Sequence, residues 1–136
     1  MSNELYSDLI LELYENPSNK GKLSNPTLFL QGGNPVCGDK ISFYLNISNN
    51  IIQEISFEPE GCAISTACAS VLTELIKGKQ VSDVLDMSST DIFEVTGTIM
   101  PLRIKCALLG LTVVQKGLKQ WLENPTQTKI VTGLKI

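Results

Sequence analysis

The chain contains no histidine, and neither sign of charge is in large excess. Without histidine there is no imidazole to bind a metal, and no residue pattern suggests a general acid–base pair. Any metal site must therefore use thiolates and carboxylates. A net charge of -3, with one small basic cluster at Lys77 and Lys79, argues against a nucleic-acid surface, which needs clustered Lys and Arg.

Long apolar runs are also missing. No segment approaches the roughly 18 apolar residues of a membrane span. Glu4 and Asp8 lie where a signal peptide would be basic and then apolar. We therefore expect a cytoplasmic protein that does not associate with membranes. In that compartment thiols stay reduced, so the four cysteines are interpreted first as metal ligands, nucleophiles or core residues, with disulfides as a minor alternative.

The chain has enough apolar sequence for one domain. Its 136 residues, of which 43% are hydrophobic, can bury a core without disulfides or other staples. No repeat or linker divides it, so we predict a single domain over residues 1–136. The segment after about residue 124 is polar and then mixed, shows no clear pattern and is expected to be a mobile tail.

Hydrophobic periodicity predicts a small sheet followed by helices. Period-two alternation predicts a strand at 41–47, a turn at Asn49-Asn50 and a return strand at 51–57, with a third strand at 27–30. Apolar residues at helical spacing predict helices at 3–14, 63–77, 82–85, 90–95 and 102–123. The predicted fold class is α+β, a three-stranded antiparallel sheet with helices covering one face.

Three of the cysteines lie at the ends of predicted elements. Cys37 precedes a strand, Cys62 begins a helix after Gly61, and Cys106 lies near the start of the last helix. A helix N-terminus favours the thiolate, so Cys62 is predicted to be the most readily ionised thiol. Asp39 can point to the same side as Cys37 if the strand has already begun. Three thiolates and one carboxylate suit tetrahedral Zn²⁺, but thiolates also suit iron, so ligand type does not choose the metal.

Structural roles remain open for some of these residues. Cys68 lies six residues after Cys62, about 120° away on a helix, and within an apolar stripe, so we assign it to the core. Asp39 alone is also typical of a carboxylate that caps a turn. For Cys106, the choice between a ligand and a core residue stays open, because its helix is very apolar. Residue types and spacing alone therefore favour a metal site without establishing it.

Four short stretches along the chain carry a more specific signal. They are NPVCGD at 34–39, EGCAIS at 60–65, IKGK at 76–79 and RIKCA at 103–107. Any one of them is weak, but in this order they resemble the IscU/SufU (NifU N-terminal-like) iron–sulfur cluster assembly scaffold family. The similarity covers roughly residues 5–122.

The resemblance implies a SufE/NifU-like fold with an exposed site formed by Cys37, Asp39, Cys62 and Cys106. It implies a cysteine desulfurase, dependent on pyridoxal phosphate, as the sulfur donor. Cys62, Cys106 and Cys37 are then the candidate persulfide acceptors, and iron–sulfur acceptor or carrier proteins receive the product. We expect a scaffold that is a monomer or weak dimer, with Zn²⁺ in the resting site and a transient [2Fe–2S] cluster.

The resemblance leaves alternatives open because the motifs mix two branches of the family. EGCAIS and RIKCA resemble SufU, and Lys105 stands where IscU proteins have a histidine; we expect this cation to stabilise neighbouring thiolates. The extra segment that SufU proteins carry between Cys62 and Cys106 is absent, as in IscU. Residues 100–104 depart from the chaperone-binding motif of IscU. The alternatives are a zinc-dependent sulfurtransferase that activates the desulfurase and relays persulfide, and a structural zinc domain.

Overall fold

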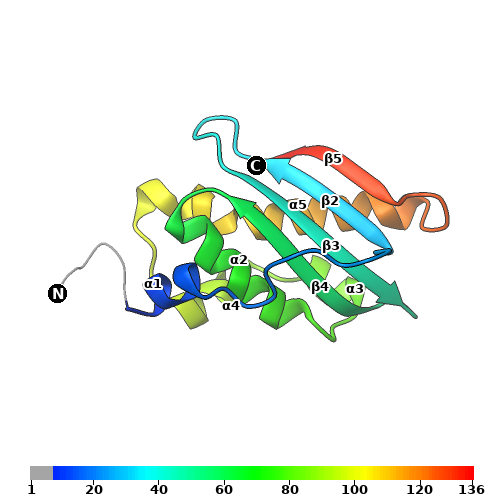
Figure 1. Ribbon diagram of the computed structural model, residues 1–136, viewed down its shortest axis with the longest axis horizontal. Helices are drawn as coiled ribbons and strands as arrows, with labels where there is room; N and C mark the ends of the chain where they lie inside the picture. The colour runs from blue at the N-terminus through cyan, green and yellow to red at the C-terminus, as the bar shows by residue number, and fades with distance from the viewer. Residues whose placement is uncertain (1–7) are drawn as a thin grey trace.

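The computed structural model describes residues 8–136, which form a sheet and a set of helices packed together (Figure 1). The elements in chain order are α1 (Asp8–Glu15), β2 (Leu28–Gly33), β3 (Lys40–Ser48), β4 (Ile51–Glu60), α2 (Ala63–Ile76), α3 (Val81–Leu85), α4 (Ser89–Thr96), η1 (Pro101–Arg103), α5 (Ile104–Glu123) and β5 (Ile130–Lys135). The predicted α+β fold class is confirmed. Of the predicted first helix, residues 3–7 lie outside the described part of the chain.

The sheet has the order β4-β3-β2-β5. The antiparallel pairing of β2, β3 and β4 agrees with the prediction. Asn49 and Asn50 form the predicted turn with φ of 54° and 60°, a conformation that asparagine tolerates better than most residues.

The prediction of three antiparallel strands is wrong in one respect, because β5 adds a fourth strand parallel to β2. The segment after residue 124, expected as a tail, supplies this strand. Only Val131 and Leu134 of β5 are buried, and the pairing shifts register between Leu30 and Gly32. The interrupted burial pattern hides the period-two signal by which a strand is found in sequence.

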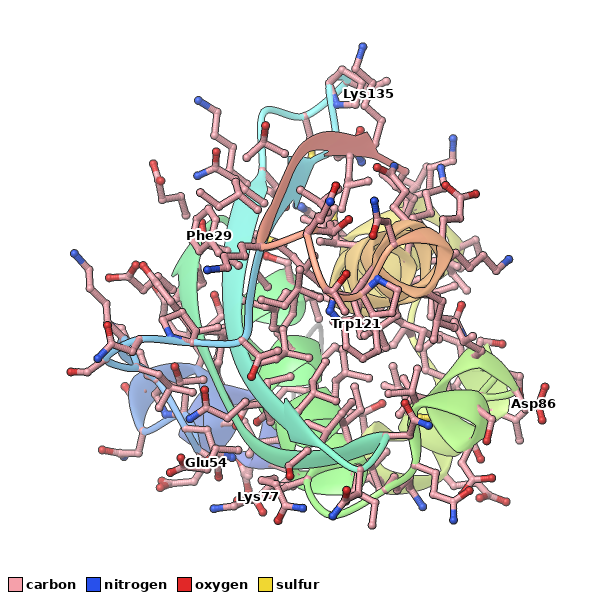
Figure 2. All side chains as sticks on the ribbon, turned by 90° about the vertical axis from the view of Figure 1, so that its right-hand side faces the viewer. Phe29, Glu54, Lys77, Asp86, Trp121 and Lys135 are labelled. Carbon is pink, nitrogen blue, oxygen red and sulfur yellow. The ribbon has the colours of Figure 1, made fainter. Side chains whose placement is uncertain are left out.

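The core lies between one face of the sheet and the long helices α2 and α5. Figure 2 shows α5 on one side of the sheet, with Phe29 on the opposite side. Phe43 and Phe57 project into the core, fully buried, with ring centroids 6.2 Å apart. Cys68 is 1% exposed and belongs to this core, as its helical phase predicted.

This arrangement brings three chain segments together at one end of the sheet. The loop from β2 to β3, the N-terminus of α2 and the N-terminus of α5 meet there, and each carries one of the predicted site cysteines. Along residues 8–136 the structure contains no helix that is both long and apolar enough to traverse a bilayer.

Candidate metal and sulfur site

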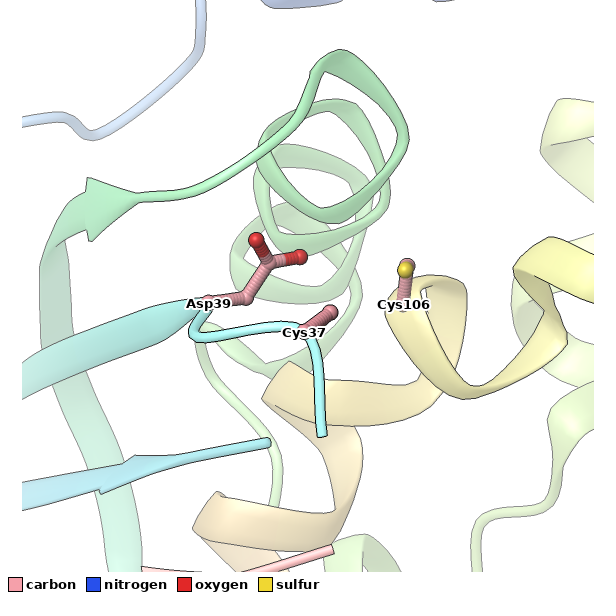
Figure 3. Close-up of side chains that lie close together, drawn as sticks. All are labelled: Cys37, Asp39 and Cys106. Atoms are coloured by element: carbon pink, nitrogen blue, oxygen red, sulfur yellow. The ribbon is translucent and has the colours of Figure 1, made fainter. Parts of the chain in front are cut away.

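Cys37, Asp39 and Cys106 converge at this end of the sheet (Figure 3). Their two sulfur atoms and a carboxylate oxygen all lie within 4.8 Å of one another. Cys37 is exposed, whereas Asp39 is 9% and Cys106 is 5% exposed. The group therefore has one candidate ligand that faces solvent and two that are almost enclosed by protein.

Cys62 lies beside this group but not within it. It is the N-cap of α2, as predicted, and is half-buried. Its thiol is hydrogen-bonded with that of Cys106, and its Sγ lies 3.8 Å from the Ser65 hydroxyl. The structure thus brings three of the four predicted ligands into one cluster and leaves Cys62 in contact with it through Cys106. The complete four-residue ligand set stays a prediction.

Asn34 shapes the loop that carries Cys37 and Asp39. Its side-chain oxygen accepts a hydrogen bond from the Val36 amide at 3.0 Å, and its carbonyl accepts one from the Gly38 amide at 2.8 Å. Its own amide donates to the Asp39 carbonyl at 2.9 Å. This residue is only 6% exposed, and sequence reasoning did not identify its role. The signal was available, because an Asn before Pro is typical of a turn in which the side chain binds the backbone two residues later.

Gly61 makes room for the Asp39 carboxylate. A Cβ atom at this position would lie 2.9 Å from Asp39 Cγ and 2.6 Å from the Ser65 hydroxyl oxygen, both closer than atoms tolerate. The carboxylate therefore packs directly on the backbone just before α2. A glycine before a helix is ordinary in sequence, so nothing local could reveal this contact.

Asp39 also provides a direct test of whether the site suits a metal ion. Its Oδ2 atom is buried and has no hydrogen-bond partner in the structure. Burying an unpaired carboxylate oxygen is unfavourable, and a bound cation would compensate for it. Thiolate sulfur and carboxylate oxygen are both established ligand types for Zn²⁺, and thiolates also hold iron. The residues present therefore fit either metal.

The surroundings of Cys106 determine when its thiol ionises. Burial raises its pKa to about 12, and nearby Cys62 and Asp39 add to the rise, while a hydrogen bond from Arg103 lowers it. In the metal-free protein this thiol stays protonated at neutral pH. Metal binding must therefore release its proton, since only the thiolate is a strong ligand.

The cation that contacts Cys106 is Arg103, one turn earlier in the chain, which sequence reasoning had not assigned a role. Lys105, to which we had given the task of stabilising thiolates, has an exposed side chain. Arg103 lies in η1, the short helical turn that leads into α5. Lys105 is next to Cys106 in sequence, but adjacent residues on a helix point about 100° apart, so its role toward the thiolates stays a prediction.

Comparison with known proteins shows which family the chain resembles. Residues 5–128 match the sequence profile described as NifU-like N terminal domain. The chain is 35% identical over 119 residues to the iron-sulfur cluster assembly scaffold protein IscU of Aquifex aeolicus (strain VF5), covering 86% of this chain and 76% of that protein. It is 36% identical over 131 residues to the zinc-dependent sulfurtransferase SufU of Bacillus subtilis (strain 168), covering 83% and 88%.

A solved structure supports the same relationship. It is the crystal structure of a putative iron-sulfur cluster assembly scaffold protein for the SUF system from Fervidobacterium islandicum AW-1, with a TM-score of 0.70 and 26% identity. The similarity covers 84% of this chain and 96% of that one. The chain belongs to the NifU-like N-terminal domain family.

Proposed function

We propose that the protein is an iron–sulfur cluster assembly scaffold that accepts sulfur from a cysteine desulfurase dependent on pyridoxal phosphate. The observation that carries this proposal is the convergence of Cys37, Asp39 and Cys106, together with a buried Asp39 carboxylate oxygen that has no hydrogen-bond partner. Similarity to the IscU protein of Aquifex aeolicus supports it. Iron and sulfur are the cargo, assembled as a [2Fe–2S] cluster on these residues and Cys62. An external thiol or electron-transfer protein supplies the two electrons that convert each persulfide sulfur to sulfide, and the cluster is passed to acceptor or carrier proteins in the cytosol.

Cys37 is the thiol most accessible to a donor protein, since Cys62 is half-buried and Cys106 is buried. The acceptor thiolate attacks the outer sulfur of the donor's persulfide. The donor's S–S bond breaks, its cysteine leaves as a thiolate, and a new S–S bond forms on the acceptor, with no net oxidation. Cys62 and Cys106 remain candidates for a later relay because their thiols are in contact.

In the resting protein, Cys37, Asp39, Cys106 and Cys62 would hold Zn²⁺, whose charge keeps thiolates ionised at neutral pH. A carboxylate is the weakest and most replaceable member of such a set. The burial of Asp39 against Gly61 positions this ligand without help from a side-chain hydrogen bond to Oδ2.

The second candidate is a zinc-dependent sulfurtransferase that activates the desulfurase and relays persulfide to another acceptor. The 36% identity to SufU of Bacillus subtilis favours it. In this alternative the same thiols receive sulfur, but no cluster accumulates on the protein.

Anaerobic reconstitution with iron, cysteine, the desulfurase and a thiol reductant distinguishes the two functions. A cluster absorption spectrum that moves to an apo-ferredoxin supports the scaffold. Stable zinc, faster desulfurase turnover and no cluster support the sulfurtransferase. Both proposals fail if Cys37→Ser, Cys62→Ser and Cys106→Ser each leave metal content and both activities unchanged.

A further inference from the structure

Strand β5 borders the base of the loop that carries Cys37 and Asp39. The loop leaves β2 immediately after Gly33, which pairs with Lys40 of β3 on one side and with Lys135 of β5 on the other. The Ile136 amide donates a hydrogen bond to the Gly33 carbonyl at 3.3 Å. Figure 1 shows β5 running beside β2 toward the end where this loop begins. β5 lies outside residues 5–128, the part of the chain that matches the family.

The end of β2 depends on its neighbours for order, because it consists of Gly32 and Gly33. Glycine has the most conformational freedom to lose and offers no side chain to pack. Both positions exclude a larger residue. A Cβ atom on Gly32 would lie 2.5 Å from the Leu134 carbonyl oxygen, and one on Gly33 would lie 2.7 Å from the Asp39 carbonyl oxygen. Only glycine fits at these two positions, because the backbone of β2 lies close to β5 on one side and to the loop on the other.

β5 is in turn attached to α5, the helix that carries Cys106 in its first turn. Val131 and Leu134 are buried in the core, and the ammonium group of Lys116 on α5 donates to the Lys135 carbonyl at 2.5 Å. β5 thus connects the helix that holds one ligand with the strand end from which the other two emerge. This connection constrains how far the loop can move relative to Cys106.

The side chains of β5 do not fill the space beside the loop. A groove of about 360 Å³ lies between them, lined by Gly133, Leu134 and Lys135 on one side and by loop residues including Asn34 and Asp39 on the other. Any influence of β5 on the loop therefore passes through the backbone at Gly33.

We propose that β5 is a positioning strand for the metal and sulfur site, holding the base of the Cys37–Asp39 loop in register with Cys106. Leu134 anchors the strand and the Ile136 amide transmits its position to Gly33. This inference rests on the proposed function, because it treats Cys37, Asp39 and Cys106 as one ligand set.

Removing residues 130–136 tests the proposal on otherwise intact protein. Amide hydrogen exchange of the metal-free variant should accelerate in the loop, where the Asn34 and Gly38 amides are hydrogen-bonded, and stay unchanged in α2 and in β3 and β4. Zinc affinity, measured by competition with a chelator, should fall by roughly 10–100-fold, as for loss of an outer contact to a metal ligand. The cobalt-substituted variant should lose intensity in its tetrahedral absorption bands. A folded variant with unchanged loop exchange and unchanged affinity overturns the proposal.

A pair of point substitutions keeps the test decisive if the shortened chain does not fold. Ile136→Pro removes the amide hydrogen that bonds to Gly33, whereas Ile136→Ala keeps it and removes most of the side chain. The proline variant should show faster exchange in the loop than the alanine variant, with the same far-ultraviolet circular dichroism. Equal loop exchange in the two variants rejects the role of β5.

These measurements also separate this proposal from the proposed function, because exchange in the metal-free protein involves neither a sulfur donor nor iron. If the loop responds but the wild-type protein neither assembles clusters nor relays sulfur, the proposed function fails and the positioning role stands. If the wild-type protein assembles clusters and the loop does not respond, only the positioning role fails.

Discussion

The two halves of the site differ in how they are held. Cys37 and Asp39 belong to a loop between strands, where Val36 is 88% exposed and a few short-range hydrogen bonds define the path of the chain. Cys62 is the N-cap of α2 and Cys106 lies in the first turn of α5, two long helices that pack against each other. One half lies on a loop in which Cys37 is exposed and Asp39 is buried, and the other is continuous with the core.

This difference matches the two tasks of a protein that receives sulfur and retains metal. An exposed thiol on a loop can be reached by a donor protein, whereas a buried thiol in a rigid helix turn keeps its position when ligands exchange. Cys106 is also nearly surrounded by protein, so a metal bound there is shielded from solvent on that side. The comparison predicts that substitutions in the helix half should reduce metal retention most. Substitutions in the loop half should mainly change the positions of Cys37 and Asp39.

The largest expected effect comes from Cys106→Ser. It should abolish stoichiometric zinc binding, a larger loss than the roughly 10–100-fold expected for an outer contact. A serine hydroxyl is a much poorer zinc ligand than a thiolate. Metal analysis of purified protein measures the outcome.

Cys68→Ala is the matched control, because Cys68 is also buried but lies in the core. It should retain zinc and lower the free energy of unfolding by about 1–2 kcal/mol through the small cavity it leaves. If the Cys68 variant lost zinc as completely as the Cys106 variant, the distinction between a ligand and a core thiol would be wrong.

The pH dependence of stability tests whether Cys68 is a neutral core thiol. Burial raises the pKa of Cys68 to about 12 from an ordinary value of 9.0, with smaller contributions from Cys62 and Cys106. Above pH 9 the unfolded chain therefore loses this proton before the folded protein does. The stability contributed by the neutral thiol is complete below pH 9 and is lost as pH rises toward 12, by up to about 4 kcal/mol.

Denaturant unfolding of the metal-free protein between pH 8 and 11 checks this prediction. The quantity to compare is the difference between wild type and Cys68→Ala, in which contributions common to both proteins cancel. That difference in unfolding free energy should shrink as pH rises and change sign before about pH 11, because the loss then exceeds the packing contribution of about 1–2 kcal/mol. A difference independent of pH contradicts the assignment.

Asn34→Ala should weaken the loop half without touching a ligand. It removes the acceptor for the Val36 amide, and we expect zinc affinity to fall by about tenfold, because the loop must be ordered again on binding. Asn34→Asp keeps an acceptor oxygen at the same place and should restore most of the affinity. Chelator competition measures both variants. If Asn34→Ala and Asn34→Asp bound zinc with equal affinity, the hydrogen bond to the Val36 amide would not be what orders the loop.

The smallest effect is expected for Arg103→Met. Loss of its hydrogen bond should raise the pKa of Cys106 further, so alkylation of this thiol in the metal-free protein at pH 9 should slow by a few-fold. Lys105→Met is the control, since the Lys105 side chain is exposed and should leave the rate unchanged. Mass spectrometry of the alkylated Cys106 peptide gives the rates. If only the Lys105 variant reacted more slowly, Lys105 rather than Arg103 would be the residue that stabilises the Cys106 thiolate.

Much of the fold could be predicted because its signals are local. The alternation from Ile41 to Ile47 and the turn at Asn49-Asn50 define a hairpin whose partners are close in sequence, and the structure confirms it. Helical phase separated Cys68 from Cys62 for the same reason. Asn34 also had a local signal, which we did not use.

Sequence by itself determined the hairpin, the helix N-termini at which Cys62 and Cys106 lie, and the core position of Cys68. Only the tertiary structure decided that β5 pairs with β2, that Asp39 packs on Gly61 with one oxygen unpartnered, and that Arg103 contacts Cys106. The first set depends on periodicity over a few neighbouring residues. The second depends mainly on the way distant segments pack, and on a side-chain direction, neither of which a pattern of residue types records.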